Sequence, residues 1–294
     1  MLNHLTFRRG ATTAAVALTT LSAAAAAQRG TLFIVGGGPQ PAPLVKQFVD
    51  LAGGSHAKIA IFAEASEDGE KSGVEKADEL HALGADARSI WVTREQANTD
   101  SVAHLLDEAT GVYFGGGDQV KLIKVLRGTK TEAAIRRRYE NGAVVAGTSA
   151  GAAVMSELML TGDERHPGGA RRDTTNNFMT IARGNIVLDT GFALIRNAVI
   201  DQHFLRRKRH NRLISVVLEH APHLGAGIDE STALIVHPDG HWSVAGESVV
   251  TIYDARSAHI TPASAGVLGA SDVRLHILPA GSTFDPKSGK AVAR

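Results

Sequence analysis

A serine between two glycines is the residue of this sequence best suited to chemistry. Ser149 lies in the segment GTSAGA, after an apolar run at residues 143–146 and before a helical pattern at 152–160. A serine at such a strand-to-helix turn is exposed at the carboxyl edge of a sheet, and the glycines permit the tight turn. We therefore expect Ser149 to be a nucleophile, with the Ala150 N–H as a donor to an oxyanion. The alternative, a phosphate loop, usually has a lysine or more glycines.

A serine nucleophile needs a neighbouring base, which is most often histidine. The chain has 13 histidines, and most must be surface groups or satisfied core groups. His203 differs from the others because it follows the apolar residues 198–200, in the segment DQHF. A strand there would bring it to the same sheet edge as Ser149. We therefore expect His203 to be the general base.

A run of three glycines, followed by Asp118 and Gln119, comes directly after another apolar run at residues 111–114. Its bare backbone amides would point into the cleft at the sheet edge, and we expect Gly116 to be the second oxyanion donor. Gln119 would then hold a substrate amide or carboxylate. The alternative is a simple glycine turn. A similar run at residues 36–38 has no polar partner, so we interpret it as structural.

The acid that orients the histidine is harder to choose. Glu164 follows the helix predicted after Ser149, in a segment predicted to be a loop, and we expect it to fill this role. Asp163 and Asp173 remain open as alternatives. The acidic pair at residues 229–230, in the segment GIDEST, is interpreted as structural support for the sheet edge.

A basic cluster follows His203, and its arginines at 207, 209 and 212 would not all share one helical face. We expect Arg207, Arg209 and Arg212 to line the entrance of a cleft and to bind acidic substrate groups through paired hydrogen bonds. The alternatives are a solvated basic face or a nucleic-acid patch. An aromatic content of 5% and a net charge of +1 argue against nucleic acid.

Strand and helix patterns alternate through the first half of the chain, which predicts a parallel sheet covered on both faces. We therefore expect a three-layer α/β/α sandwich with a mostly parallel sheet and an antiparallel C-terminal extension of the same domain. The strands are predicted at residues 31–35, 57–62, 89–93, 111–114 and 143–146, and in the last quarter at 232–236, 241–244, 248–253 and 273–278. The helices are predicted at residues 43–52, 69–83, 101–108, 120–126 and 131–140.

The first residues are interpreted as a leader and not as part of the fold. Two arginines at positions 8 and 9 precede an alanine-rich run at 11–27, which is typical of a signal peptide. The run is too short and too weakly hydrophobic for a membrane anchor. We expect cleavage after residue 27, a single catalytic domain at 28–294, and export to the periplasm or medium; the alternative is a cytosolic protein with a disordered tail. The chain has no cysteine, which excludes disulfides and thiol chemistry.

These motifs resemble those of the cyanophycinases, within the dipeptidase E-like serine peptidases. GGGDQ resembles the family's glycine loop, and GTSAGA resembles its nucleophile turn. The stretch DQHFLRRKRHNRL fits the family pattern D-Q-H-F-x-x-R-x-R-x-x-R-L at every fixed position, and GIDEST resembles a later segment. The resemblance covers roughly residues 30–236.

The resemblance implies a class I glutamine-amidotransferase-like fold, a homodimer, and neither a metal nor an organic cofactor. It implies hydrolysis of cyanophycin, a poly-aspartate with arginine on each side chain, to β-aspartyl-arginine. The substrate-binding residues that it implies are Gln119, Asp201, Gln202, Arg207, Arg209 and Arg212.

Two other functions remain open. An aspartyl or isoaspartyl dipeptidase of the same clan would have a closed pocket, whereas an enzyme that cuts a polymer needs an open groove. A catalytically silent binding protein on this fold would place no carboxylate against His203.

Overall fold

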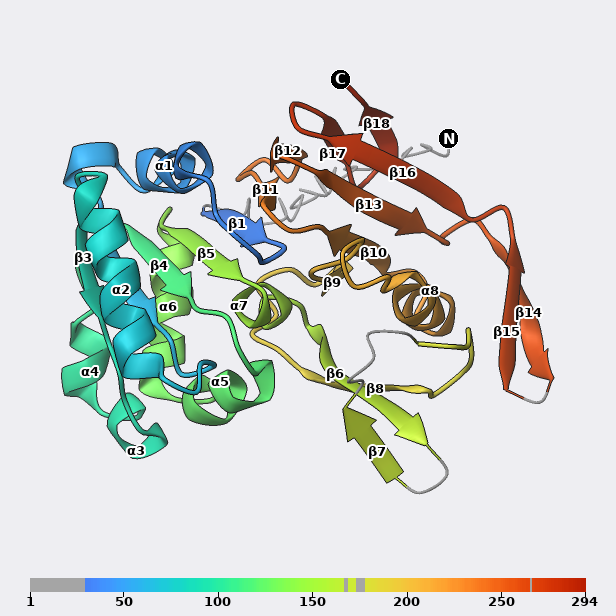
Figure 1. The fold of residues 1–294 in the computed structure, drawn as a ribbon, viewed down its shortest axis with the longest axis horizontal. Coiled ribbons are helices and arrows are strands. Elements are labelled where there is room, and N and C mark those ends of the chain that lie inside the picture. The colour runs from blue at the N-terminus through green and yellow to red at the C-terminus, as the bar shows by residue number, and fades with distance from the viewer. Residues whose placement is uncertain (1–29, 167–168, 173–177, 265) are drawn as a thin grey trace, which may run out of the picture.

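The computed structural model describes residues 30–166, 169–172, 178–264 and 266–294. Five parallel strands form one side of its largest sheet, in the order β3-β2-β4-β5-β1 with β3 at the edge (Figure 1). Their bounds are β1 Thr31–Val35, β2 Lys58–Phe62, β3 Asp86–Ser89, β4 Gly111–Phe114 and β5 Val144–Thr148.

Helices cover both faces of this sheet because successive side chains of each strand point to opposite faces. In β1, Phe33 and Val35 pack against α1 and α2, whereas Leu32 and Ile34 belong to the core formed with α5 and α6. The predicted three-layer sandwich is confirmed. The helices of this half are α1 Ala42–Leu51, the 3₁₀ helix η1 Gly54–His56, α2 Gly69–Ala82, α3 Arg94–Ala97, α4 Asp100–His104, α5 Gln119–Leu126 and α6 Lys130–Glu140.

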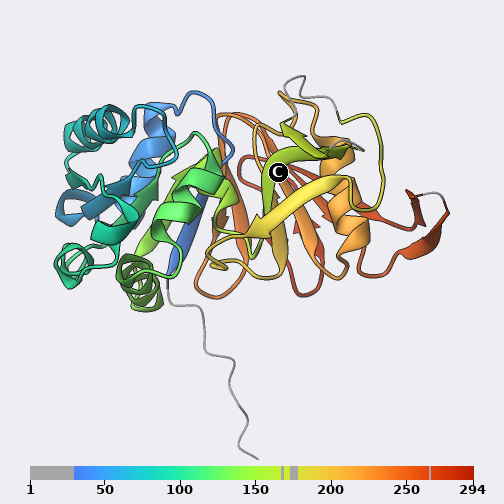
Figure 2. The same cartoon turned by 90° about the horizontal axis from the view of Figure 1, so that it is seen from below.

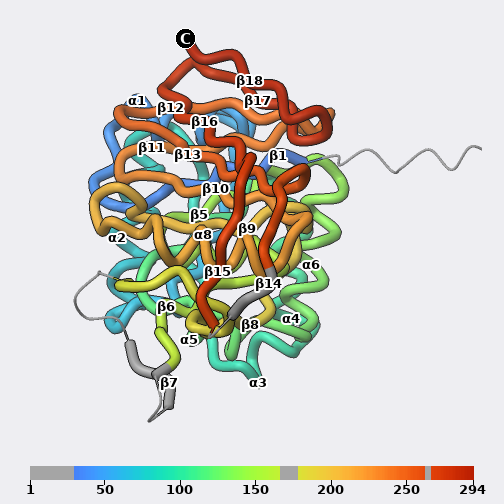
Figure 3. Tube along the Cα trace, turned by 90° about the vertical axis from the view of Figure 1, so that its right-hand side faces the viewer, coloured from blue at the N-terminus to red at the C-terminus, as the bar shows by residue number. Residues whose placement is uncertain are grey.

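The C-terminal strands extend the main sheet and add a second one, as Figure 2 shows on the orange and red side of the molecule. Next to β1, the main sheet continues antiparallel through β11 Thr232–Val236, β12 Trp242–Gly246, β17 Thr283–Asp285 and β18 Lys290–Val292. The second sheet contains β9 Ala198–Asp201, β10 Leu224–Ile228, β13 Val249–Asp254 and β16 Arg274–Pro279, and α8 His210–Glu219 packs against it. The hairpin of β14 His259–Ser264 and β15 Val267–Ser271 projects from this end (Figure 1) and faces the viewer in Figure 3.

Two predicted elements differ from the structure. The helix after Ser149 is only one turn long, α7 Ala150–Ala153, and the chain continues into β6 Leu158–His166. β6 pairs with β7 Gly169–Arg172 and β8 Ile186–Thr190, and this pairing buries Met159 and Leu160. A short apolar run fits either a helix or a strand, so the partner strand decides. The strand predicted at 89–93 is β3, which begins three residues earlier and ends four residues earlier, where it pairs with β2.

The predicted signal peptide, residues 1–27, lies outside the described residues. Within the residues that the structure describes, no helix is both long enough and apolar enough to span a membrane.

Candidate active site

Ser149 occupies a sharp turn between β5 and α7. Its φ of 53° is unusual for a residue with a side chain, and its N–H donates to the Val35 carbonyl of the adjacent strand. A Cβ on Gly147 would lie 2.3 Å from the carbonyl oxygen of Gly151. The two flanking glycines therefore let the chain double back, and this turn exposes the serine at the carboxyl edge of the sheet.

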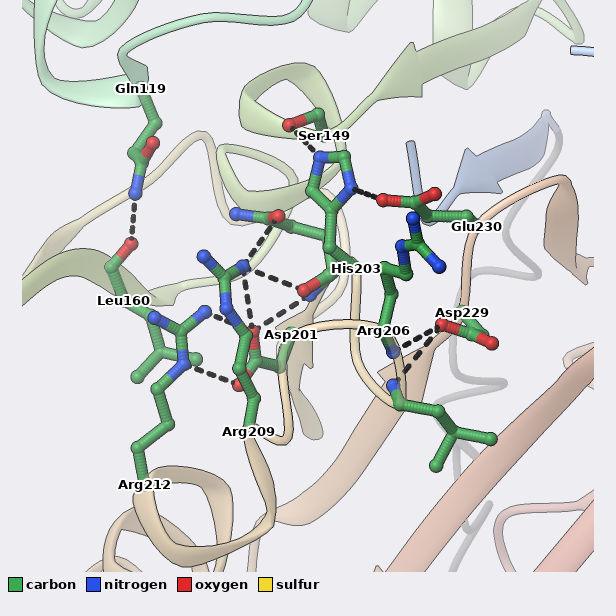
Figure 4. Close-up of polar contacts among 12 residues, drawn as sticks. Gln119, Ser149, Leu160, Asp201, His203, Arg206, Arg209, Arg212, Asp229 and Glu230 are labelled. Carbon is green, nitrogen blue, oxygen red and sulfur yellow. Dashed lines mark hydrogen bonds and ion pairs between the residues drawn. The ribbon is translucent and has the colours of Figure 1, made fainter. Parts of the chain in front are cut away.

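A serine, a histidine and a carboxylate lie in line at this edge (Figure 4). Ser149 Oγ is 2.8 Å from His203 Nε2, and His203 Nδ1 is 2.6 Å from Glu230 Oε1. Because a carboxylate can only accept there, Nδ1 carries the hydrogen and Nε2 is left to accept from the serine hydroxyl. The side chains of His203 and Glu230 are 9% and 26% exposed. This is the arrangement of a nucleophile, its base and an orienting acid.

The carboxylate beside His203 is Glu230, which corrects the expectation that Glu164 would be there. Glu164 and Asp163 lie on β6, where Glu164 is opposite Arg171 of β7 and Ile186 of β8. The third alternative, Asp173, lies outside the described residues. β9 and β10 are parallel neighbours, with Asp201 paired to Gly227, so the loops that follow them meet at one edge. Glu230 in GIDE follows a buried strand, as His203 does, and the same edge rule could have identified it.

The glycine run at residues 36–38, interpreted above as structural, packs directly against this pair. A Cβ on Gly37 would lie 2.4 Å from His203 Cε1, and one on Gly38 would lie 2.8 Å from Glu230 Oε2. Both glycines also have positive φ, 103° and 70°. The backbone of Gly36 accepts from the His203 N–H at 2.6 Å. Only residues without a side chain leave room for the imidazole and the carboxylate there.

The surroundings of His203 keep its imidazole neutral. Burial lowers the pKa of His203 below its ordinary value, and the nearby charges of Arg207 and Arg209 lower it further, although the hydrogen bond that His203 donates to Glu230 opposes this. A neutral imidazole at neutral pH can accept the proton of a serine.

Gly116 and Ala150 flank the serine as expected. A Cβ built on Gly116 would lie 3.4 Å from Ser149 Cβ, and Ala150 is the first residue of α7. Within the described ranges, no protein acceptor takes either N–H in a hydrogen bond. Both amides are therefore available to a substrate oxygen.

Most of the predicted substrate-binding side chains form a buried network instead of lining a cleft entrance (Figure 4). Arg212 Nε donates to Asp201 Oδ2 at 2.7 Å, a second contact joins Nη2 to Oδ1, and the arginine side chain is only 2% exposed. Arg209 Nη1 donates to both the carbonyl and the side-chain oxygen of Gln202, each at 2.7 Å. The expectation is corrected for Arg209 and Arg212, whose guanidinium groups are buried; Arg207 is partly exposed.

Two further residues hold the loops of the site together. Gln119 is buried, and its amide donates to the Leu160 carbonyl of β6 at 2.7 Å. Asp229 Oδ1 accepts from the backbone N–H groups of Leu205 and Arg206, each at 3.1 Å, and its Oδ2 accepts from Ser248 Oγ. Asp229 thus has the structural role expected for it. The described residues contain no group of three or more potential metal ligands.

Residues 32–243 match the family model described as peptidase family S51. The chain belongs to this family. It is 34% identical over 268 residues to a cyanophycinase of Trichormus variabilis, covering 88% of this chain and 86% of the relative. It is 30% identical over 275 residues to a cyanophycinase of Geminocystis herdmanii, covering 90% and 97%. The predicted resemblance is confirmed, and the protein is a serine-type peptidase.

Two solved structures have the same fold. A peptidase from an acI-B1 Actinobacterium has a TM-score of 0.63 at 22% identity, covering 88% of this chain and 98% of that chain. A putative peptidase E protein from Listeria monocytogenes has a TM-score of 0.51 at 15% identity, covering 74% and 99%. These similarities confirm the α/β architecture.

Proposed function

We propose that this protein hydrolyses cyanophycin, with Ser149 as nucleophile, His203 as general base and Glu230 as the acid that orients it. The observation that carries the proposal is the line of contacts from Ser149 Oγ to His203 and on to Glu230, at 2.8 and 2.6 Å. The substrate is inferred from the relatives named cyanophycinase, which align with nearly nine-tenths of this chain.

The chemistry follows from the positions of these groups. As Ser149 Oγ attacks the carbonyl carbon of an Asp–Asp backbone amide, His203 Nε2 takes its proton, and the Glu230 carboxylate stabilises the imidazolium that forms. The N–H groups of Gly116 and Ala150 donate to the oxygen that becomes negative. His203 then protonates the leaving amine, and water releases the acyl group from the serine. The product is β-aspartyl-arginine.

Two further proposals concern the location of the enzyme and its oligomeric state. Residues 1–27 have the pattern of a signal peptide, so we propose removal of this segment and export of a mature chain that begins near Gln28. We also propose a homodimer. Mass analysis of the N-terminus from the periplasm or medium tests the first, and size-exclusion chromatography with light scattering tests the second.

The activity is tested by incubating the purified mature protein with insoluble cyanophycin, and measuring clearing and dipeptide release by mass spectrometry. Wild type should clear the suspension and release β-aspartyl-arginine. Ser149→Ala should release none above background while keeping the wild-type melting temperature, because the glycines maintain the turn. Cleavage of β-aspartyl dipeptides without clearing would favour the dipeptidase alternative. Unchanged cleavage by Ser149→Ala would remove the proposed nucleophile.

A further inference from the structure

A pocket of about 200 Å³ adjoins Ser149 on the face of the sheet covered by α1 and α2. Gly116 and Thr148 connect it to the serine, because a Cβ on Gly116 would lie 3.4 Å from Ser149 Cβ and Thr148 precedes Ser149. Gln119 contacts β6, and the buried arginines pair with residues at the end of β9 and just after it, so they belong to other elements of the site. The walls of the pocket are mixed, with Ile61 and Ala63 as apolar lining residues, and its polar lining side chains include Gln40, Ser66, Ser72, Lys76 and Tyr113.

A largely buried lysine supplies the charge of this pocket. Lys76 lies on α2, and its side chain is only 14% exposed. Its Nζ lies 4.8 Å from the centre of the Tyr113 ring, 2.5 Å from Glu79 Oε2 and 3.4 Å from Gln40 Oε1. Burial alone would lower the pKa of Lys76, but Tyr113 and Glu79 more than offset this, so the pKa is raised. The ammonium group is therefore charged at neutral pH.

Several hydroxyl groups also line the pocket. Ser66 and Ser72 lie 3.0 Å apart through their Oγ atoms, and the Tyr113 hydroxyl pairs with the Gln40 amide. The hydroxyl oxygen of Thr148 is buried and has no hydrogen-bond partner among the residues described. A buried hydroxyl is normally satisfied, and either an ordered water or a bound group in the pocket would satisfy this one. An ammonium group together with hydroxyl donors suits a carboxylate and repels a guanidinium.

We infer that this pocket binds the free α-carboxylate of an arginyl unit beside the scissile bond. The inference rests on the proposed function, since cyanophycin joins each arginine through its amino group and leaves one carboxylate and one guanidinium per unit. Lys76 discriminates between these two ends, because it attracts the carboxylate and repels the guanidinium. It is thereby a specificity-determining residue that positions the chain on Ser149.

The test uses a substrate of two β-aspartyl-arginine units, which has a single scissile bond. Three forms are compared: both arginyl carboxylates free, only the acyl-side one amidated, and only the leaving-side one amidated. For wild type, we expect kcat/KM to fall about tenfold or more for one of the amidated forms, as one lost charge-assisted hydrogen bond implies. Lys76→Gln should cleave the free form about tenfold more slowly, and it should show no further loss on amidation.

Lys71→Gln is the matched control, because Lys71 is on the same helix with its side chain 70% exposed. It should discriminate like wild type. Lys76→Arg keeps the charge and should keep the amidation penalty, which provides a test should Lys76→Gln not fold in a thermal melt.

Equal cleavage of all three forms by wild type would overturn the subsite while leaving the hydrolase intact. If amidation slows Lys76→Gln as much as it slows wild type, the subsite is also overturned, because a group other than Lys76 would then bind the carboxylate. If wild type cleaves no form and does not clear cyanophycin, the proposed function itself fails, and the subsite with it.

Discussion

Replacing Glu230 with glutamine removes one negative charge from beside His203 and leaves a side chain of nearly the same shape. The glutamine oxygen can still accept the His203 Nδ1 hydrogen, so the imidazole is held in place. The imidazolium that forms as Ser149 loses its proton then has no counter-charge. We expect Glu230→Gln to lower kcat far more than it lowers stability.

The magnitude follows from the contact itself. Two unit charges at the observed 2.6 Å attract by about 6 kcal/mol at an effective dielectric constant of about 20. The partial exposure of Glu230 lets solvent screen part of this, which leaves about 3–5 kcal/mol for the transition state. Each factor of ten in rate corresponds to about 1.4 kcal/mol, so kcat should fall by about 10²–10⁴-fold.

The assay is the initial rate of dipeptide release from soluble cyanophycin oligomers, with a thermal melt of each variant. Glu164→Gln is the matched control, since it makes the same change in the carboxylate first expected from the sequence, and it should stay within about twofold of wild type. A large loss in Glu164→Gln with near-normal turnover in Glu230→Gln would refute the assignment drawn from the contacts of His203.

Three further changes test other parts of the site. The lowered pKa of His203 predicts that kcat/KM of the wild type declines only below pH 6.5. Arg207→Gln should move this decline to higher pH, because the variant loses a positive charge that lowers the pKa of His203. A pH series measures both profiles, and an unmoved profile in the variant would contradict this. Gly37→Ala should lower kcat/KM about 100-fold, because the added methyl group displaces the His203 imidazole. Gly84→Ala is the control and should not lower kcat/KM, because Gly84 has a similar positive φ but open space where the methyl group would lie. Equal rates in both variants would count against the role of Gly37. Arg212→Ala should lower the free energy of unfolding by about 3 kcal/mol, because it removes the nearest cation from a buried carboxylate and leaves Asp201 only the more distant Arg209, 3.7 Å away; denaturant titration measures this, and an unchanged midpoint would be incompatible with the buried pair.

The central fold could be predicted from the sequence because its apolar runs are buried on both sides. All five residues of β1 are buried, as expected for a parallel strand between two helical layers. The segment after Ser149 could not be predicted in the same way. Its first turn is helical, but Leu158–His166 becomes a strand because β7 and β8 pair with it. Such pairing between distant segments leaves little trace in local periodicity.

The residues of the site were likewise only partly predictable from the sequence. Ser149 and His203 were identifiable because each lies just after an apolar strand, although β5 belongs to the main sheet and β9 to the second sheet. Glu230 obeys the same rule but lies 27 residues after His203, in a segment expected only to support the sheet. What placed it beside the imidazole is the parallel pairing of β9 with β10, a relation between strands that no spacing in the chain expresses.

The arginine pattern acts chiefly on the conformation of the histidine loop. His203 has a φ of 48°, which an L-residue adopts at a cost of about 1–3 kcal/mol unless its surroundings hold it there. Arg209 holds the preceding Gln202 through two hydrogen bonds, and Arg212 holds Asp201 through its buried pair. The fixed spacing of these arginines is therefore explained by the need to keep the imidazole on Ser149. Since the guanidinium groups of Arg209 and Arg212 are buried, we expect the substrate's charged groups to be bound by partly exposed groups such as Arg207 and by the proposed Lys76 pocket.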